Sequence, residues 1–305
     1  MDTAFASAPA ARRIVSSQLS YDLYADAVFA RRPGYRDLTL DLLRPLGDAL
    51  PPVVVWIHGG SYISGTHRAL PDPLRPSRLD ERLVGAGFAV ARVSYRFSAE
   101  ARFPAQLLDV RAAIRWLRRH AVALRLDGSK IGVWGESAGG HLAALACLAP
   151  DGLFLDADVD GDVTADVTAD VQAGVIWYAP SDFLTLQEQN RADSQIDHNA
   201  ADAPGGLLLG APITTVRDDA RAASSVTYAH PGAPAMLLAH GRIDGVVPVG
   251  QSEELHEALL ARGADSSLTI IEGADHCFIG ADLDPLVAQA VAFFQQKLRS
   301  NAESR

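Results

Sequence analysis

Cysteine is nearly absent from this sequence: Cys147 and Cys277 are the two thiols in 305 residues. They form no CxxC pair and no spacing typical of a zinc site, and nothing in the pattern requires a disulfide. Long apolar runs are lacking too, because no stretch approaches the roughly 18 residues of a membrane span. The first residues, MDTAFASAPAARR, lack the basic start and apolar run of a signal peptide. We therefore expect a cytoplasmic protein that does not bind membranes.

Positive charge is in deficit. Lys and Arg total 27 against 37 Asp and Glu, which gives a formal net charge of −10. Such a protein repels phosphate backbones at long range, so nucleic acid is not an expected partner. The densest basic cluster lies on one side of a predicted helix, where we expect a solvated face. It consists of Arg111, Arg115, Arg118 and Arg119.

Motifs for metals and nucleotide cofactors are also missing. The run DADVDGD at 156–162 resembles the opening of a calcium loop, but its twelfth position is Val167 where such a loop needs Glu. No Walker loop and no G-x-G-x-x-G after a strand is present. We expect no metal and no cofactor. The sequence leaves the oligomeric state open.

Apolar, β-branched runs alternate with helical patterns along the chain. This alternation indicates an α/β fold with a mostly parallel central sheet flanked by helices. The first two predicted strands are of the kind that form an antiparallel edge. Strands are predicted at 14–24, 36–43, 52–58, 88–95, 130–135, 171–178, 235–240 and 267–272. Helices are predicted at 104–124, 138–148, 251–262 and 285–298.

Two segments interrupt the alternation. Residues 156–170 are acidic with a short VTAD repeat, which predicts a solvated loop. Residues 183–225 lack a clear strand and fall late in the order of strands, where a lid is expected. Neither segment has the composition of a linker. We therefore expect a single domain over 1–305 with a small lid insertion at about 181–226.

The main chemical signal is Gly135-Glu136-Ser137-Ala138-Gly139, a G-x-S-x-G pattern between a predicted strand and a predicted helix. Glycine two residues to either side permits the sharp turn that lifts the serine hydroxyl above the strand ends. The free N–H groups and dipole of a helix N-terminus favour negative charge beside that hydroxyl. The pattern predicts that Ser137 is a nucleophile in acyl transfer.

A second glycine motif, His58-Gly59-Gly60-Ser61, directly follows the strand predicted at 52–58. Taken alone it is also compatible with an ordinary glycine turn. Together with the serine motif, it predicts an oxyanion hole made by the backbone N–H groups of Gly60, Ser61 and Ala138. Tyr62 and Gly59 are candidates for substrate contact.

The base and the acid are expected later in the chain, in the order Ser, Asp or Glu, His. His276 follows the last predicted strand in GADH, and Asp244 follows the preceding strand in HGRID. We expect His276 to be the general base and Asp244 to orient it. Asp182, in APSD, is the rival for the acid.

Other residues near these motifs receive different interpretations. His58, His141 and His240 are expected to be structural, whereas His198 and His230 are candidates for substrate contact. Asp275 is adjacent to His276 and is expected to point elsewhere. Glu136 is expected to brace the serine turn or the histidine loop. Cys277 lies outside any strand–turn–helix motif, so a small buried residue is expected there in place of a thiol nucleophile.

Together these motifs resemble a known family. HGGSYISG, GESAGGHLAAL, HGRIDGVVP and GADH are similar to the hormone-sensitive-lipase-like and the bacterial acetyl xylan and feruloyl esterase (BD-FAE-like) branches of the α/β-hydrolases. The similarity runs from about Thr39 to His276. It implies an α/β-hydrolase fold, with Ser137, Asp244 and His276 as catalytic triad. The family usually has a third glycine and then an aromatic residue after HGG, where this chain has Ser61 and Tyr62.

The resemblance implies a serine carboxylic-ester hydrolase that acts on small acyl or aryl esters through an acyl-enzyme. An arylformamidase or other small-amide hydrolase is the alternative within hydrolases, because the same residues serve both reactions. A non-catalytic binding protein on this fold is the alternative from another class. A dehalogenase would need Asp where Ser137 stands.

Overall fold

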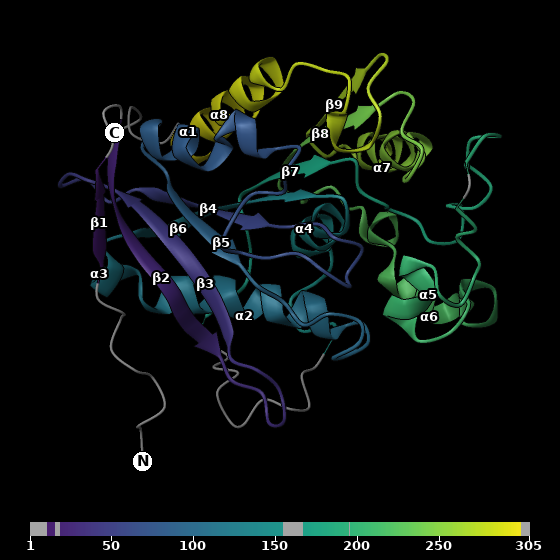
Figure 1. Cartoon of the computed structure of the whole chain (residues 1–305), viewed down its shortest axis with the longest axis horizontal. Coiled ribbons are helices and arrows are strands. Elements are labelled where there is room, and N and C mark those ends of the chain that lie inside the picture. Colours follow the sequence, from purple (N-terminus) through teal and green to yellow (C-terminus); the bar gives the residue numbers. More distant parts are fainter. Residues whose placement is uncertain (1–10, 16–18, 155–166, 195, 300–305) are drawn as a thin grey trace.

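The structure, a computed structural model, describes residues 11–15, 19–154, 167–194 and 196–299. These residues form a nine-stranded sheet in the order β1-β2-β3-β5-β4-β6-β7-β8-β9, with helices on both faces (Figure 1). The strands are β1 (Arg12–Val15), β2 (Ser20–Ala30), β3 (Leu38–Pro45), β4 (Pro52–Ile57), β5 (Ala89–Val93), β6 (Asp127–Glu136), β7 (Ala173–Trp177), β8 (Ala235–Gly241) and β9 (Ser266–Ile271). The α-helices are α1 (Leu79–Gly85), α2 (Ala105–Arg119), α3 (Ala121–Leu124), α4 (Ala138–Leu148), α5 (Pro204–Leu209), α6 (Arg217–Ala223), α7 (Gly250–Ala261) and α8 (Asp284–Arg299).

The sheet has the predicted mostly parallel character. Strands β4 to β9 pair in parallel, whereas β1, β2 and β3 form an antiparallel edge that joins the sheet through β5. One strand prediction is wrong, because the run 14–24 is two strands and not one. β1 and β2 pair antiparallel, with Val15 opposite Ser20, so the run folds back on itself. An alternating pattern continues on both arms of a hairpin and does not reveal the reversal.

Strand β4 shows why the middle of the sheet is apolar throughout. Val53, Val55 and Ile57 pack into the core on the side of α2, α4 and α7. Val54 and Trp56 pack into the opposite core, against α1 and α8 (Figure 1). Every residue of this strand is buried. A strand covered by helices on both faces is expected to read as a continuous apolar run.

The arginine cluster of α2 is not the solvated face that its spacing predicts. Arg111 is 2% exposed and donates to the carbonyl groups of Ala149 and Pro150. Arg115 and Arg118 donate to the carbonyl groups of Val167 and Asp170. These guanidinium groups satisfy backbone acceptors around the stretch that joins α4 to β7. The helical pattern could not reveal those partners, because they come from distant parts of the chain.

A helical segment connects β7 to β8. It contains α5, η2 (Ile213–Thr215), α6 and η3 (Ser225–Tyr228), and no strand occurs among its described residues. Leu208 of α5 accepts a hydrogen bond from the N–H of Phe103, just before α2. His141 of α4 donates from Nε2 to the carbonyl of Ala223, at 2.6 Å. The segment is thus attached to the helices on one face of the sheet.

The acidic run at 156–162, with its resemblance to a calcium loop, lies outside the described residues. None of the described helices has both the length and the apolar composition needed to cross a membrane.

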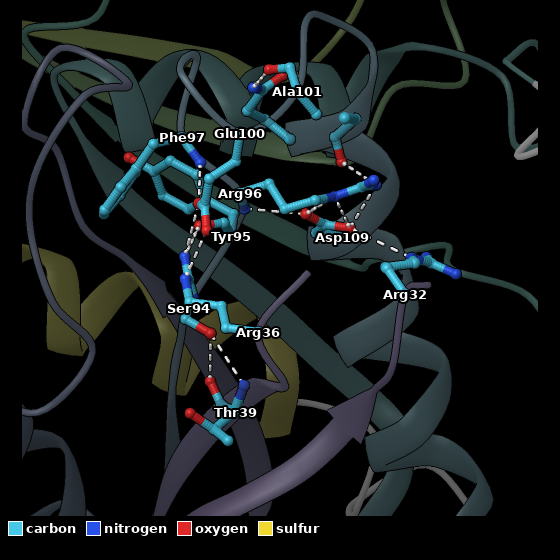
Figure 2. A network of polar contacts seen from close by, with 12 residues as sticks. Arg32, Arg36, Thr39, Ser94, Tyr95, Arg96, Phe97, Glu100, Ala101 and Asp109 are labelled. Atoms are coloured by element: carbon cyan, nitrogen blue, oxygen red, sulfur yellow. Dashed lines mark hydrogen bonds and ion pairs between the residues drawn. The ribbon is translucent and has the colours of Figure 1, made fainter. Parts of the chain in front are cut away.

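A buried ion pair fixes the chain after β5 to helix α2. Arg96 donates to Asp109 from its backbone N–H, from Nε and from Nη2, each at 2.9 Å, and Asp109 is fully buried. Arg32 lies on the other side of the same carboxylate, at 3.7 Å (Figure 2). One buried carboxylate is therefore the counterion of two buried guanidinium groups.

We predict that Asp109→Asn lowers the free energy of unfolding by about 3–5 kcal/mol, because it leaves buried guanidinium charge without a counterion. Urea unfolding followed by tryptophan fluorescence measures this loss. Asp284→Asn is the control, since it removes the partner of Arg82 in an exposed pair. Equal stability of the two variants would contradict the role given to Asp109.

We also predict a pH-dependent contribution from His141, which is fully buried. Burial lowers its pKa from 6.5 to about 4. As the pH falls, the imidazole of His141 is therefore protonated in the unfolded chain before it is protonated in the folded protein. The folded state is favoured by this difference above pH 6.5, and it loses free energy of unfolding as the pH falls toward 4. Relative to His141→Gln, the wild type should lose about 1.4 kcal/mol per pH unit in that window. Parallel stability curves for the two proteins would refute this.

Candidate active site

Ser137 occupies a sharp turn between β6 and α4, as the G-x-S-x-G pattern predicts. Its backbone has φ 53° and ψ −123°, a conformation rare for a residue with a side chain. Its N–H donates to the carbonyl of Trp177 on β7 at 2.9 Å, which holds the turn in place. A strained serine at this point of a parallel sheet projects its hydroxyl beyond the strand ends.

Glycine is required on both sides of this serine. A Cβ at Gly135 would lie 2.1 Å from the carbonyl oxygen of Gly139. A Cβ at Gly139 would lie 2.1 Å from the carbonyl oxygen of Ile57, at the end of β4. The first turn of α4 is therefore packed directly against β6 and β4. This contact brings the start of the helix next to the His58–Gly59–Gly60 turn.

The structure brings together the three residues predicted from chain order. His276 Nε2 lies 3.1 Å from Ser137 Oγ, and its Nδ1 lies 2.7 Å from Asp244 Oδ2. His276 opens η4 (His276–Phe278) after β9, and Asp244 follows β8. Ser137 is 8% exposed and Asp244 is 2% exposed, so the hydrogen-bonded chain is largely shielded from water. With Nδ1 donating to the carboxylate, Nε2 is free to accept the serine proton.

Asp244 is held as an anion. Burial alone would raise its pKa, but hydrogen bonds from His240 and His276 outweigh that effect and lower the pKa well below its usual range. Its Oδ1 also accepts the N–H groups of Val246 and Val247, each at 2.8 Å. Such contacts favour the ionised form, so the carboxylate is charged at neutral pH.

Two residues near the triad have roles that the sequence did not reveal. His240 is fully buried, with Nε2 3.3 Å from Asp244 Oδ2 and Nδ1 accepting from Ser252. Asp275 Oδ1 accepts the N–H groups of Gly245 and His276, at 2.8 and 2.7 Å, and so ties the aspartate loop to the histidine loop. Asp commonly caps the turn that follows it, and the position of Asp275 directly before His276 was the one local signal of this role.

The rival acid and the other candidate histidines lie elsewhere. Asp182 accepts from the N–H of Leu184 and the hydroxyl of Ser224, so it stabilises a turn after β7. His198 is buried and its backbone N–H donates to Gln187. His230 accepts the N–H of Ala233 through its own carbonyl. Within the described residues, none of these three side chains hydrogen-bonds to the triad.

The turn after β4 has an unusual backbone. Gly60, Ser61 and Tyr62 have φ angles of 101°, 57° and 63°, all in the left-handed region. The carbonyl of Gly60 accepts the N–H groups of Ile63 and Ser64, each at 3.0 Å. In the described part of the chain, the N–H groups of Gly60, Ser61 and Ala138 donate to no other protein group. They are the three predicted oxyanion donors.

Tyr62 and Gly59, the two candidates for substrate contact, are both buried. The Tyr62 hydroxyl lies 3.0 Å from His141 Nδ1, so the ring points into the core. The N–H of Gly59 donates to the carboxylate of Glu136. Substrate contact by either residue stays a prediction. Glu136 braces the serine turn against the turn after β4.

Among the described residues, one group has the spacing of metal ligands: Asp26, Asp41 and His67. Arg68 lies 2.7 Å from Asp26, and Arg92 lies 3.0 Å from Asp41. Two guanidinium groups therefore already supply positive charge to these carboxylates, and the group fits an ion-pair network better than a metal site.

A cavity of about 390 Å³ lies between the start of α2 and the helical segment. Neither Ser137 nor His276 lines it, so it is separate from the reacting atoms. Its lining residues are Arg102, Phe103, Pro104, Phe154, Leu209, Asp219 and Ala222.

Comparisons with known proteins find esterases among the relatives of this chain. Esterase LipQ of Mycobacterium tuberculosis is 30% identical over 275 residues, which cover 86% of this chain and 60% of LipQ. The chain thus spans less than two thirds of that relative. A truncated carbohydrate esterase from gut microbiota has a TM-score of 0.76 at 25% identity, covering 94% of this chain and 99% of that chain. A bifunctional GH43-CE protein of Bacteroides eggerthii has a TM-score of 0.75 at 28% identity, covering 90% and 38%.

The family comparison covers most of the chain. The BD-FAE family profile matches residues 40–259, a range that includes the turn after β4, Ser137 and Asp244 and ends before His276. With its α/β-hydrolase fold and this match over more than half of its length, the chain belongs to the BD-FAE family.

Proposed function

We propose that this protein is a serine hydrolase that cleaves small carboxylic esters in two steps. The observation that carries the proposal is the hydrogen-bonded chain from Ser137 through His276 to Asp244. The names of the relatives, LipQ as an esterase and the structure from gut microbiota as a carbohydrate esterase, support ester bonds as the target.

In the first step, Ser137 Oγ attacks the ester carbonyl carbon while His276 Nε2 accepts the serine proton. The imidazolium that forms is stabilised by the ionised Asp244. His276 then gives the proton to the leaving alcohol, and the acyl group remains on Ser137. In the second step, His276 takes a proton from water, and the water oxygen attacks the acyl carbon. The bond between the acyl carbon and Ser137 Oγ then breaks, the carboxylic acid leaves, and His276 returns the proton to Ser137. The residues present need no metal or cofactor for this cycle.

The negative charge that develops on the carbonyl oxygen is placed against backbone donors. Those donors are the N–H groups of Gly60, Ser61 and Ala138, the last at the start of α4. Oriented donors in a site shielded from water are commonly the largest contribution to acyl-transfer catalysis. The side chain of Ser61 does not alter its N–H, so a serine can replace glycine here provided that φ 57° is maintained.

The helical segment at about 181–226 is proposed to form a lid over one side of the substrate site within a single domain. It is anchored to α4 through His141 and to α2 through Phe103. The name of the carbohydrate esterase makes esters of carbohydrates the first natural substrates to test.

We predict that Ser137→Ala lowers ester hydrolysis by about 10³- to 10⁶-fold, because the nucleophile is lost. The assay panel is p-nitrophenyl acetate to decanoate, methyl ferulate, acetylated xylo-oligosaccharide and N-formylkynurenine. The same panel ranks esters against formamides. If the wild type cleaves none of these, the binding-protein alternative is favoured, and if the variant matches an active wild type, Ser137 is not the nucleophile.

We predict that Asp244→Asn lowers kcat by about 10³- to 10⁴-fold, because it removes the charge that fixes the histidine tautomer. Asp182→Asn is the matched control and should retain activity within about 3-fold, since its carboxylate serves a turn. Steady-state kinetics on the best ester measures both variants. A larger loss in Asp182→Asn would transfer the acid role to that residue.

A further inference from the structure

The two peptide groups that flank Gly59 are held by buried side chains. Its N–H donates to the carboxylate of Glu136. Its carbonyl accepts from the hydroxyl of Tyr95 at 3.2 Å and from His58 Nδ1 at 2.7 Å. The same Tyr95 hydroxyl donates to the carbonyl of His58 at 2.9 Å, so its one hydrogen is shared between the two carbonyls. The carbonyl of Gly59 and the N–H of Gly60, the first proposed oxyanion donor, belong to the same peptide group.

Glu136 connects the serine turn to the N–H of Gly59. It is 3% exposed and is the residue immediately before Ser137. A Cβ on Gly59 would lie 2.4 Å from Glu136 Oε1, so the carboxylate rests directly on the glycine. Any movement of the turn after β4 relative to Ser137 must therefore break or stretch this contact.

Tyr95, whose hydroxyl donates to the carbonyl groups of His58 and Gly59, is itself held by several contacts. It is fully buried, and its ring stacks on His58 with centroids 4.6 Å apart. Its carbonyl accepts from Arg36 at 2.8 Å, and the next residue, Arg96, is paired with Asp109 (Figure 2). Tyr95 thus connects the residues drawn in Figure 2 to the carbonyl groups of His58 and Gly59 in the turn after β4.

We infer that Glu136 and Tyr95 are positioning residues, which clamp the peptide groups on either side of Gly59 so that the N–H groups of Gly60 and Ser61 face the carbonyl oxygen bound at Ser137. The inference rests on the proposed function. Left-handed φ angles at three consecutive residues are unfavourable for Ser61 and Tyr62, so this turn needs outside support to stay in place. Small displacements of donors weaken oxyanion binding steeply.

Tyr95→Phe removes one hydroxyl and keeps the ring. We expect kcat to fall about 10- to 100-fold with KM within about 3-fold, since the donors act mainly in the transition state. Ser77→Ala is the control, because it removes a buried hydroxyl that donates to a backbone carbonyl, that of Leu74, outside the candidate site. Thermal unfolding of both variants shows whether the loss reflects stability alone.

Glu136→Gln retains an oxygen that accepts the N–H of Gly59, whereas Glu136→Ala leaves that N–H without its acceptor. We expect Glu136→Gln to keep more activity than Glu136→Ala by about 10-fold or more. Asp80→Asn, a change at another buried acid, controls for loss of buried charge. If Glu136→Ala does not fold, Tyr95→Phe and Glu136→Gln decide the question.

The specific readout is inhibition by an alkyl trifluoromethyl ketone. Ser137 Oγ adds to its carbonyl carbon, the serine proton passes to His276, and the resulting oxyanion lies against the donors. The clamp predicts that Tyr95→Phe weakens this inhibitor in parallel with kcat, while KM for the ester is nearly unchanged. If both variants retain wild-type kcat and inhibitor affinity, the clamp is refuted while the esterase proposal stands. If the wild type hydrolyses no ester, the proposed function fails and the clamp fails with it.

Discussion

Helix α4 begins closer to strands β4 and β6 than any residue with a side chain would permit. Gly139 lies against the carbonyl of Ile57, and Gly135 lies against the carbonyl of Gly139 itself. This packing forces Ser137 into its strained backbone conformation and places the end of β4 beside the start of the helix. The serine turn and the turn after β4 are therefore one packed unit. The remainder of the candidate site is arranged around that unit.

Each loop of the candidate site is held in place by its own hydrogen-bonding side chains. The aspartate and histidine loops are joined by Asp275, and the ionised Asp244 orients the imidazole. The turn after β4 is held by Glu136 and Tyr95. The proposed chemistry needs a mobile proton on His276 alone. Rigid support of every other group is consistent with preorganised acyl transfer.

The sequence was sufficient for features that depend on local pattern or on chain order. The strand–turn–helix around Ser137 is local, and the order of serine, acid and base restricts Asp244 and His276 to the ends of two late strands. Partners distant in sequence could not be read in this way. The burial of Arg111 depends on carbonyls at 149 and 150, and the core-facing ring of Tyr62 depends on a left-handed backbone. The hairpin within 14–24 was hidden because alternation survives a reversal.

The most direct test of the central claim is mass spectrometry of the protein quenched in acid during turnover of p-nitrophenyl acetate. The account predicts an acetyl group on the peptide that contains Ser137, formed in the wild type and slower to leave in Asp244→Asn. Hydrolysis that proceeds with no acyl group on Ser137, or with the label on another residue, would contradict it.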